Sequence, residues 1–323
     1  MWDRWDCCGE SRGRPALSRP GWRKLVAALP LLASLGTHTS AQEPSAEDGL
    51  VPPEVAIQEG DLAHARAAFQ TKLLRKGAAP ARAAMPGTPP GVTRVEFPSG
   101  DLRLAAWLQR PAGDDGGGST SPGVVFLHGG FALGVEDWRM AAPFLEAGYV
   151  LLAPILRGEN GQGGTFTLFY DEVDDVLAAG RFLAGQAGVD PKRVYVAGHS
   201  VGGTLALLAA QSSRQFRAAA SFSGSPDQVI YCRLGIAAEQ IPFDVGDPHE
   251  LELRSPLAFA RSFQCPVRMF YGTGEPHFRL STERTAELAS AAHLDVQAIR
   301  VEGGHESAVP AEVEQSLLFF EER

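Results

Sequence analysis

The fold of this chain is decided by residues 194–212, VYVAGHSVGGTLALLAAQS. The apolar run 194–197 is typical of a strand buried in a parallel sheet, and a helix is expected over 203–212. Between them, Gly198-His199-Ser200-Val201-Gly202-Gly203 places a serine on a sharp turn from strand to helix. Such a turn strains the serine backbone and needs glycine where neighbouring segments approach closely. The stretch therefore predicts that Ser200 is a nucleophile.

Strands and helices alternate on both sides of this unit. Further strands are expected at 124–127, 150–154, 218–222, 267–271 and 296–301, and further helices at 137–147, 171–187, 282–292 and 311–321. An opening hairpin is expected from 92–97 and 102–108. Regular alternation predicts an α/β fold with a mainly parallel, twisted sheet and helices on both of its faces.

The composition is that of a globular chain with no affinity for nucleic acid. Of 323 residues, 44% are hydrophobic and 21% are charged, and the formal net charge is -9. Binding to nucleic-acid phosphates is driven by basic residues, so no nucleic-acid partner is expected. The acidic residues Asp171, Glu172, Asp174 and Asp175 open a predicted helix, where the helix dipole explains them. Neither a metal nor a cofactor is expected.

Residues 1–41 have the pattern of a signal peptide. Basic residues precede the apolar run 25–35, and Thr39-Ser40-Ala41 supplies small residues for cleavage near Ala41. The predicted location is therefore secreted or periplasmic, without stable membrane insertion after cleavage. An uncleaved anchor is the alternative, although the apolar run is short for a bilayer span.

An N-terminal extension with a Pro/Ala-rich linker is predicted over 42–90, before a catalytic domain at 91–323. A helix is expected over 53–76, because apolar residues recur at three- and four-residue spacing at Leu62, Ala65, Phe69, Leu73 and Leu74. That helix is expected to pack on the body, with a partner-binding arm as the alternative. The prolines of 77–90 predict an exposed linker. Cys232 and Cys265 can pair or stay as isolated thiols.

A serine nucleophile needs a base and an acid that orients the base, and α/β-hydrolases supply them in the chain order Ser, acid, His. His305 follows the expected strand 296–301 within Glu302-Gly303-Gly304-His305, so it is the predicted base. The predicted acid is Glu275, just after the strand 267–271. Asp295 is the alternative acid, although it precedes its strand and so lies at the other edge of the sheet.

Two backbone amides are predicted to hold the oxyanion. Phe126-Leu127-His128-Gly129-Gly130-Phe131 follows one strand, so the donors are the N–H groups of Gly130 and of Val201 after the nucleophile. A small insert at 224–256 is expected to choose the substrate. The predicted substrate-binding residues are aromatic: Tyr231 and Phe243 in the insert, and Phe131 and Phe166 near the mouth of the site.

Several motifs occur together in one order between residues 91 and 323. They are His128-Gly129-Gly130, Arg157-Gly158-Glu159-Asn160-Gly161, residues 170–177 with Asp175, Val189-Asp190-Pro191-Lys192-Arg193 and residues 198–203. In these motifs the chain resembles the catalytic domain of the prolyl oligopeptidase family and the related dienelactone-hydrolase-like esterases. The resemblance implies an α/β-hydrolase fold, a triad of Ser200, Glu275 and His305, and a structural role for Arg157. The family acid is usually Asp, and family peptidases usually carry an N-terminal β-propeller that the residues before Gly91 are too few to form.

The predicted function is a serine hydrolase that cleaves carboxylic esters through an acyl-enzyme. Its expected partner is a small ester or a short peptide. The alternative within enzymes is a serine peptidase of the prolyl oligopeptidase type that acts on small peptides. An alternative of another class is a non-catalytic binding module on a hydrolase fold, which the intact set of serine, histidine, acid and glycines disfavours.

Overall fold

The computed structural model describes residues 49–81, 83–113, 120–234 and 240–323. The predicted signal peptide and the first residues of the extension lie outside these ranges. No helix within them is long and apolar enough to cross a membrane.

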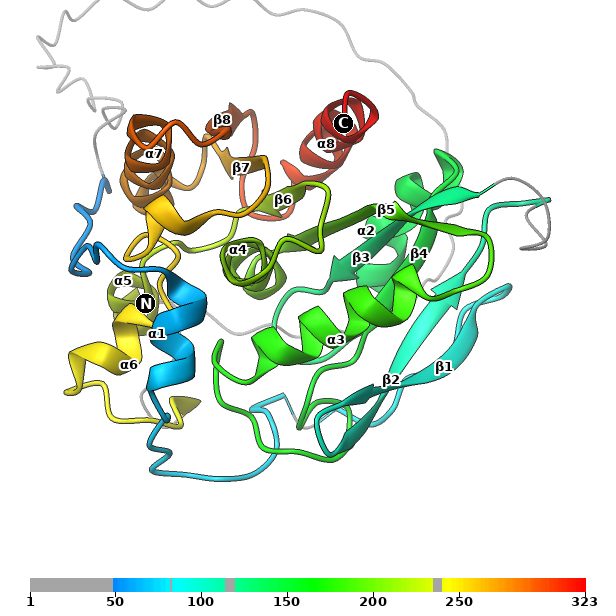
Figure 1. Ribbon diagram of the computed structural model, residues 1–323, viewed down its shortest axis with the longest axis horizontal. Coiled ribbons are helices and arrows are strands. Elements are labelled where there is room, and N and C mark those ends of the chain that lie inside the picture. Colours follow the sequence, from blue (N-terminus) through cyan, green and yellow to red (C-terminus); the bar gives the residue numbers. More distant parts are fainter. Residues whose placement is uncertain (1–48, 82, 114–119, 235–239) are drawn as a thin grey trace, which may run out of the picture. The chain divides into compact units, whose positions relative to one another are not determined.

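One eight-stranded sheet runs through the molecule in the order β1-β2-β4-β3-β5-β6-β7-β8 (Figure 1). Its strands are β1 (Thr93–Ser99), β2 (Leu102–Gln109), β3 (Ser121–Leu127), β4 (Val150–Pro154), β5 (Val189–His199), β6 (Ala219–Phe222), β7 (Val267–Gly272) and β8 (Val296–Val301). The pairs β1–β2 and β2–β4 are antiparallel, and all the others are parallel. The opening hairpin and the mainly parallel sheet are therefore confirmed.

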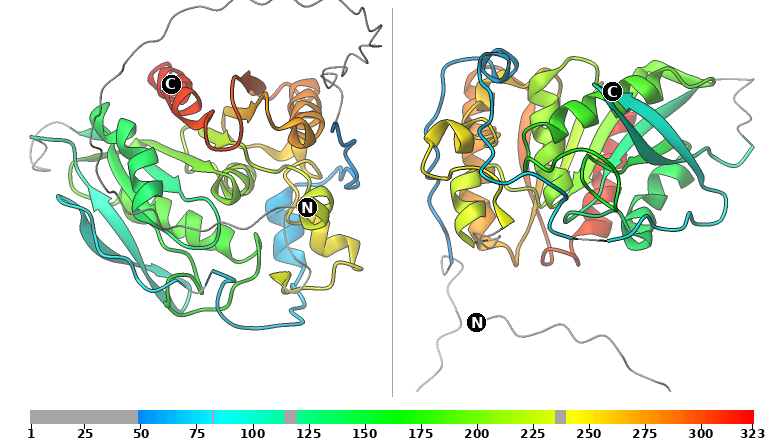
Figure 2. Two further views of the ribbon diagram at one scale, coloured as in Figure 1. Left: turned by 180° about the vertical axis from the view of Figure 1, so that it is seen from behind. Right: turned by 90° about the horizontal axis from the view of Figure 1, so that it is seen from below.

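The helices follow the predicted alternation, and Figure 2 shows the same arrangement from behind and from below. They are α1 (Leu62–Ala68), α2 (Val135–Glu146), α3 (Glu172–Ala184), α4 (Val201–Ser212), α5 (Gln228–Leu234), α6 (Pro248–Glu252), α7 (Pro276–Ala291) and α8 (Val309–Glu321), with the 3₁₀ turn η2 (Ala260–Ser262). The insert 224–256 holds α5 and α6. Helix α7 begins six residues before its predicted start, because Pro276 fits the first turn of a helix.

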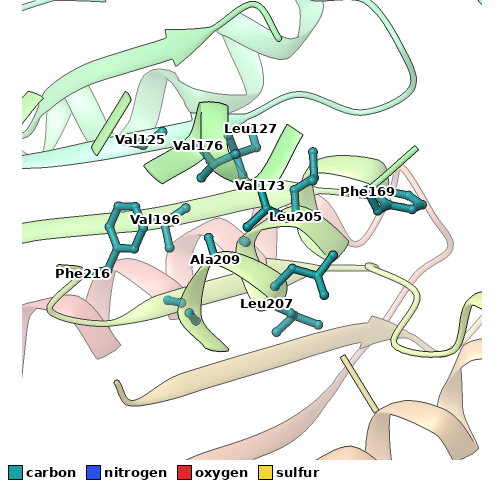
Figure 3. Close-up of a cluster of buried hydrophobic side chains, with 14 of the residues drawn as sticks. Val125, Leu127, Phe169, Val173, Val176, Val196, Leu205, Leu207, Ala209 and Phe216 are labelled. Atoms are coloured by element: carbon teal, nitrogen blue, oxygen red, sulfur yellow. The ribbon is translucent and has the colours of Figure 1, made fainter. Parts of the chain in front are cut away.

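Two hydrophobic cores lie on opposite faces of the sheet, because neighbouring side chains on a strand point to opposite sides. Val125 and Val196 pack with α3 and α4 in one core (Figure 3). Phe126 and Tyr195 pack with α2 and α8 in the other. Both faces of the central strands are thus buried, which explains why their sequences are apolar without alternation.

The N-terminal extension packs on the body, as predicted, but its helix is shorter than predicted. Helix α1 covers only Leu62–Ala68 and starts after Asp61, whose side chain accepts a hydrogen bond from the His64 amide. The expectation of one helix over 53–76 was wrong because residues on both sides of α1 bond to the insert instead of to their own helix. The amides of Glu54 and Val55 donate to Asp227 Oδ2 at 2.6 and 3.0 Å.

The predicted exposed linker, 77–90, is also held against the body in part. Ala79 is buried, and its amide donates to the carbonyl of Gly158 at 2.9 Å. The side chain of Asn160 donates to the carbonyl of Ala84 at 3.2 Å. Prolines exclude regular structure here, but they leave carbonyls free to bond elsewhere.

Candidate active site

The site lies where the chain order of the parallel strands reverses. Strand β3 is followed by β4 on one side, while β5 lies on its other side. Loops that leave the carboxyl ends of β3 and β5 must diverge at this point, and open α/β sheets bind their ligands in the resulting crevice. Gly129 and Gly130 follow β3, and Ser200 follows β5.

Ser200 occupies the strained turn that its sequence context predicts. Its backbone has φ 55° and ψ -115°, and its amide donates to the carbonyl of Phe222 at 2.8 Å. A Cβ atom on Gly202 would lie 2.2 Å from the carbonyl oxygen of Leu127, and one on Gly198 would lie 2.4 Å from the carbonyl oxygen of Gly202. Only glycine fits at both positions, so the flanking glycines allow the turn that exposes the serine.

The tertiary structure brings Ser200, His305 and Glu275 together from three loops. His305 Nε2 lies 2.9 Å from Ser200 Oγ, and His305 Nδ1 lies 2.6 Å from Glu275 Oε1. Burial acts to lower the pKa of His305, but the hydrogen bond and the charge of Glu275 outweigh it and raise that pKa. The arrangement can take a proton from Ser200 and stabilise the resulting imidazolium.

Glu275 is buried, and its hydrogen bonds favour the ionised form. Burial acts to raise the pKa of Glu275, but hydrogen bonds from His305, Ser223 and the Gly272 amide outweigh it and lower that pKa. The alternative acid, Asp295, is engaged elsewhere: its carboxylate pairs with Arg268 at 2.8 Å and with Arg323 at 2.7 Å. The structure therefore places Glu275, and not Asp295, beside the histidine.

The predicted oxyanion donors flank Ser200. A Cβ atom on Gly129 would lie 3.7 Å from Ser200 Cβ, so the loop after β3 lies against Ser200. Gly130 has φ +60°, and Val201 is the first residue of α4, where backbone N–H groups have no partner within the helix. Neither amide donates a hydrogen bond to the part of the chain that the structure describes. Both are free to hold a developing negative charge.

A buried ion pair braces the loop after β3. His128 Nε2 lies 2.8 Å from Glu159 Oε2, and Glu159 also accepts from the Leu156 amide at 3.0 Å. Burial acts to lower the pKa of His128, but the charge and hydrogen bond of Glu159 raise it to about 9. Asn160 Oδ1 accepts from the Leu133 amide at 2.9 Å. The Arg157-Gly158-Glu159-Asn160-Gly161 motif thus holds the loop after β3 in position.

A small cavity opens at Ser200, with a volume of about 250 Å³. Its lining residues are Gly129, Gly130, Glu136, Asp137, Met140, His199, Ser200, His305 and Glu306. None of the predicted substrate-binding residues Phe131, Phe166, Tyr231 and Phe243 is in this lining. Phe131 and Phe166 contact each other edge to face at 5.1 Å, and Tyr231 packs on Phe169 at 5.5 Å. Phe243 is buried under the guanidinium of Arg254, so the prediction that it lines a substrate pocket was wrong.

The acidic residues that open α3 contact polar groups elsewhere in the same chain. Arg157 Nη2 lies 2.7 Å from Asp175 Oδ1, and Asp171 also contacts Arg157. Asp174 pairs with Arg66 at 3.3 Å, and Glu172 accepts from the amide and hydroxyl of Thr167. These contacts give each of the four carboxylates a partner within the protein, and they agree with the structural role implied for Arg157.

Potential metal ligands do occur in the cavity at Ser200. Ligand atoms of His199, His305 and Glu306 lie within 4.8 Å of one another. His305 is already bonded through both ring nitrogens to Ser200 and Glu275, and His199 Nε2 lies 2.9 Å from the His305 carbonyl. An ion here would compete with the contacts of His305 to Ser200 and Glu275. His199 instead supports the loop of His305.

Two polar residues of the site were absent from the sequence-based prediction. Ser223 Oγ donates to Glu275 Oε2 at 2.5 Å, and Glu312 Oε1 lies 3.5 Å from Ser223 Oγ. Glu312 could have been noticed, because it falls on the buried stripe of α8 with Val309, Val313 and Ser316. Ser223 has no local signal, since it follows a strand like many loop serines.

Comparison with known proteins identifies the family of this chain. Residues 137–298, half of the chain, match the prolyl oligopeptidase family, the peptidase family S9. The chain belongs to the prolyl oligopeptidase family. It is 25% identical over 182 residues to the uncharacterized peptidase YtmA of Bacillus subtilis, covering 54% of this chain and 69% of that protein.

Solved structures show the fold. The Pyrococcus horikoshii acylaminoacyl peptidase matches with TM-score 0.57 and 21% identity, over 72% of this chain and 40% of that one. Thermogutta terrifontis esterase 2 matches with TM-score 0.59 and 21% identity, over 73% of this chain and 96% of that one. The α/β-hydrolase fold is therefore confirmed, and this member of the family has the fold of both peptidases and esterases. Membership of this family supports serine hydrolase activity.

Proposed function

We propose that this protein cleaves carboxylic esters through an acyl-enzyme intermediate. The observation that carries the proposal is the continuous contact from Ser200 Oγ to His305 and on to Glu275, at 2.9 and 2.6 Å. Ser200 attacks the ester carbonyl while His305 Nε2 takes its proton, and Glu275 stabilises the imidazolium. The same proton then passes to the leaving alcohol, and water releases the acid in a second, equivalent step.

Electrostatic stabilisation of the tetrahedral intermediate is assigned to two amides. The N–H groups of Gly130 and Val201 are available on either side of Ser200, and donors placed in advance cost no reorganisation when the charge develops. The cavity of about 250 Å³ fits a small acyl or alcohol group better than a long peptide. Within the described residues before β1, the only helix is α1, of seven residues, and it packs on the body of the protein.

Peptide hydrolysis is the second candidate, and family membership is the observation that favours it. YtmA is called a peptidase, and the Pyrococcus neighbour is an acylaminoacyl peptidase. The same catalytic groups can cleave an amide when His305 protonates the leaving amine. Substrate choice between the two then depends on the acyl and leaving groups that the cavity admits.

The deciding experiment compares kcat/KM for p-nitrophenyl esters of graded acyl length with kcat/KM for aminoacyl anilides. We expect short esters to be preferred and Ser200→Ala to abolish turnover and labelling by a fluorophosphonate probe. A higher kcat/KM for the anilides would assign the protein as a peptidase. Undiminished labelling of Ser200→Ala would place the nucleophile elsewhere, and no labelling of the wild type would favour a binding module.

We also propose that the protein is exported and cleaved near Ala41. Basic residues before the apolar run 25–35 and the small residues Thr39-Ser40-Ala41 support this proposal. Intact mass of the native protein is expected to show Gln42 at the N-terminus in periplasm or medium. Met1 retained on a cytosolic protein would contradict it.

A further inference from the structure

Glu275 is linked to helix α8 through a second buried carboxyl group. Ser223 Oγ donates to Glu275 Oε2 at 2.5 Å, and on its other side Glu312 Oε1 lies 3.5 Å away. The backbone of Ser223 has φ +51°, and its amide is fixed by a 3.0 Å hydrogen bond to the carbonyl of Phe270. Glu275, Ser223 and Glu312 are 2%, 1% and 0% exposed. All three side chains are therefore shielded from bulk solvent.

Counting protons shows which form of Glu312 is able to bond to Ser223. A serine hydroxyl has one hydrogen, and Ser223 gives it to the carboxylate of Glu275. The Glu312 oxygen facing Ser223 can then form a hydrogen bond only by donating, which requires a protonated carboxyl group. Its other oxygen, Oε2, has no partner among the described residues. An ionised Glu312 would face the carboxylate of Glu275 across the Ser223 hydroxyl. That hydroxyl has one proton and can donate to only one of the two carboxylates.

Within the described ranges, no charged group around α8 compensates the charge of an ionised Glu312. Helix α8 packs on α2 and β6; β6 carries no ionisable side chain, and Glu136, Arg139 and Glu146 of α2 are exposed. Arg268 and Arg323 contact the far end of α8 at Phe319 and pair with Asp295. The loop after β8 contributes His305, which bonds Glu275, and the exposed Glu302 and Glu306. Asp137 is held by the amides of Gly129 and Gly134.

We propose that Glu312 is a positioning residue of the catalytic site: as a neutral acid it donates to Ser223 Oγ, which directs the Ser223 hydroxyl to Glu275 and so fixes the orientation of His305. This inference rests on the proposed function. Burial, and then the nearby charge of Glu275, raise the pKa of Glu312 to about 8. Glu312 is thus neutral at pH 7. At higher pH it releases its proton to solvent, the donor is lost, and a second negative charge stands beside Glu275.

The first test is the pH dependence of kcat for ester hydrolysis between about pH 6 and pH 10, with Ser200→Ala as the background. The wild type is expected to lose activity in an alkaline step near pH 8. Glu312→Gln keeps a neutral donor at every pH, so that step disappears, while kcat at pH 7 falls about two- to fivefold with KM unchanged. Glu312→Leu removes the donor, so kcat falls at least about tenfold at all pH values. The exposed Glu314→Gln on the same helix is the matched control and should behave as the wild type.

The proposal is overturned if the wild type has no alkaline step, if Glu312→Gln retains it, or if Leu is tolerated as well as Gln. The rate of fluorophosphonate labelling at Ser200 gives the same pH profile without a substrate. An ester that is not hydrolysed, with labelling and its alkaline step intact, would reject the proposed substrate class and support the role of Glu312.

A second readout needs no catalysis. In the folded protein the pKa of Glu312 is about 8, against an ordinary value of 4.5, so the folded state holds a proton that the unfolded state releases. The contribution of Glu312 to stability is therefore full below pH 4.5 and declines as the pH rises towards 8. Glu312→Gln lacks this decline, so the difference in Tm between variant and wild type should grow in favour of the variant from pH 5 to pH 8. A constant difference would show that Glu312 is not held neutral.

Discussion

Glu250 and Glu312 are both fully buried, but Glu250 lies beside a cation and several hydrogen-bond donors, whereas Glu312 lies beside one hydroxyl. Glu250 accepts from the guanidinium of Arg254 at 2.5 Å, from the Thr71 hydroxyl at 2.7 Å and from the Lys72 amide at 2.6 Å. Among the residues that the structure describes, Glu312 has one hydroxyl at 3.5 Å and no cation beside it. A buried carboxylate is tolerated when a cation and hydrogen bonds replace its water, and otherwise it keeps its proton. The first arrangement ties the N-terminal extension to the insert, and the second holds a proton near the catalytic acid.

The largest effect on stability is expected from breaking the paired case. Arg254→Met leaves Glu250 as a buried charge without a cation, so the free energy of unfolding should fall by about 3 to 5 kcal/mol. The double variant Arg254→Met/Glu250→Leu should recover much of this loss. Urea denaturation of both, beside Arg261→Met in the exposed pair with Glu59, measures the difference. Equal losses for the buried and exposed pairs would contradict the comparison.

Glu275, which contacts Ser223 as Glu312 does, should matter mainly for catalysis. Glu275→Gln keeps the shape but removes the charge that stabilises the imidazolium, so kcat should fall by at least about a hundredfold with KM little changed. Glu275→Asp should be milder because the charge remains. Asp295→Asn is the control, since that carboxylate pairs with Arg268 and Arg323. If Asp295→Asn lowers kcat more than Glu275→Gln does, the assignment of the acid is wrong.

Glu159 lies between the two cases of Glu250 and Glu312. Its partner is His128, a cation only while the imidazole is protonated. The pKa of His128 is raised from 6.5 to about 9, so the pair stabilises the fold fully below pH 6.5 and the gain is lost as the pH rises through 9. Glu159→Gln should therefore cost on the order of 3 kcal/mol at pH 6 and much less at pH 10. Denaturation at both pH values measures this. The exposed pair His249–Asp247, tested with Asp247→Asn, should show no comparable change.

The smallest effect is expected where a buried carboxylate is satisfied by backbone amides alone. Asp227 accepts from Glu54 and Val55 through one oxygen and from Val229 through the other. Asp227→Asn turns one acceptor into a donor that faces amides, so stability should fall by about 1 to 3 kcal/mol. Proteolysis should then cut the extension first. Asp244→Asn, in an exposed turn, is the control, and equal losses in the two variants would refute a special role for Asp227.

The sequence predicted the fold and the meeting of Ser200, His305 and Glu275 more completely than it predicted the extension and the residues around the cavity. Local chemistry explains the first part, because the turn at Ser200 demands glycine at positions 198 and 202. The strand before Glu275 is buried along its whole length, and the edge strand before His305 pairs with it in parallel. The extension depended on contacts with Asp227 and Glu250, more than 170 positions away, which override helical spacing. Phe243 looked like a pocket residue because its hydrophobicity is the same whether it faces a ligand or Arg254.

Sequence alone thus determined which groups are available for chemistry and in which order along the chain, because strand and turn patterns are local. Only the tertiary structure decided that Glu275 and not Asp295 meets His305, since that depends on which end of each strand a residue occupies and on where the cations Arg268 and Arg323 lie. It also decided that one glutamate of a helical stripe, Glu312, faces Ser223 without a cation. The charge and burial of a side chain depend on its environment in the folded protein, and that environment forms only when distant segments of the chain pack together.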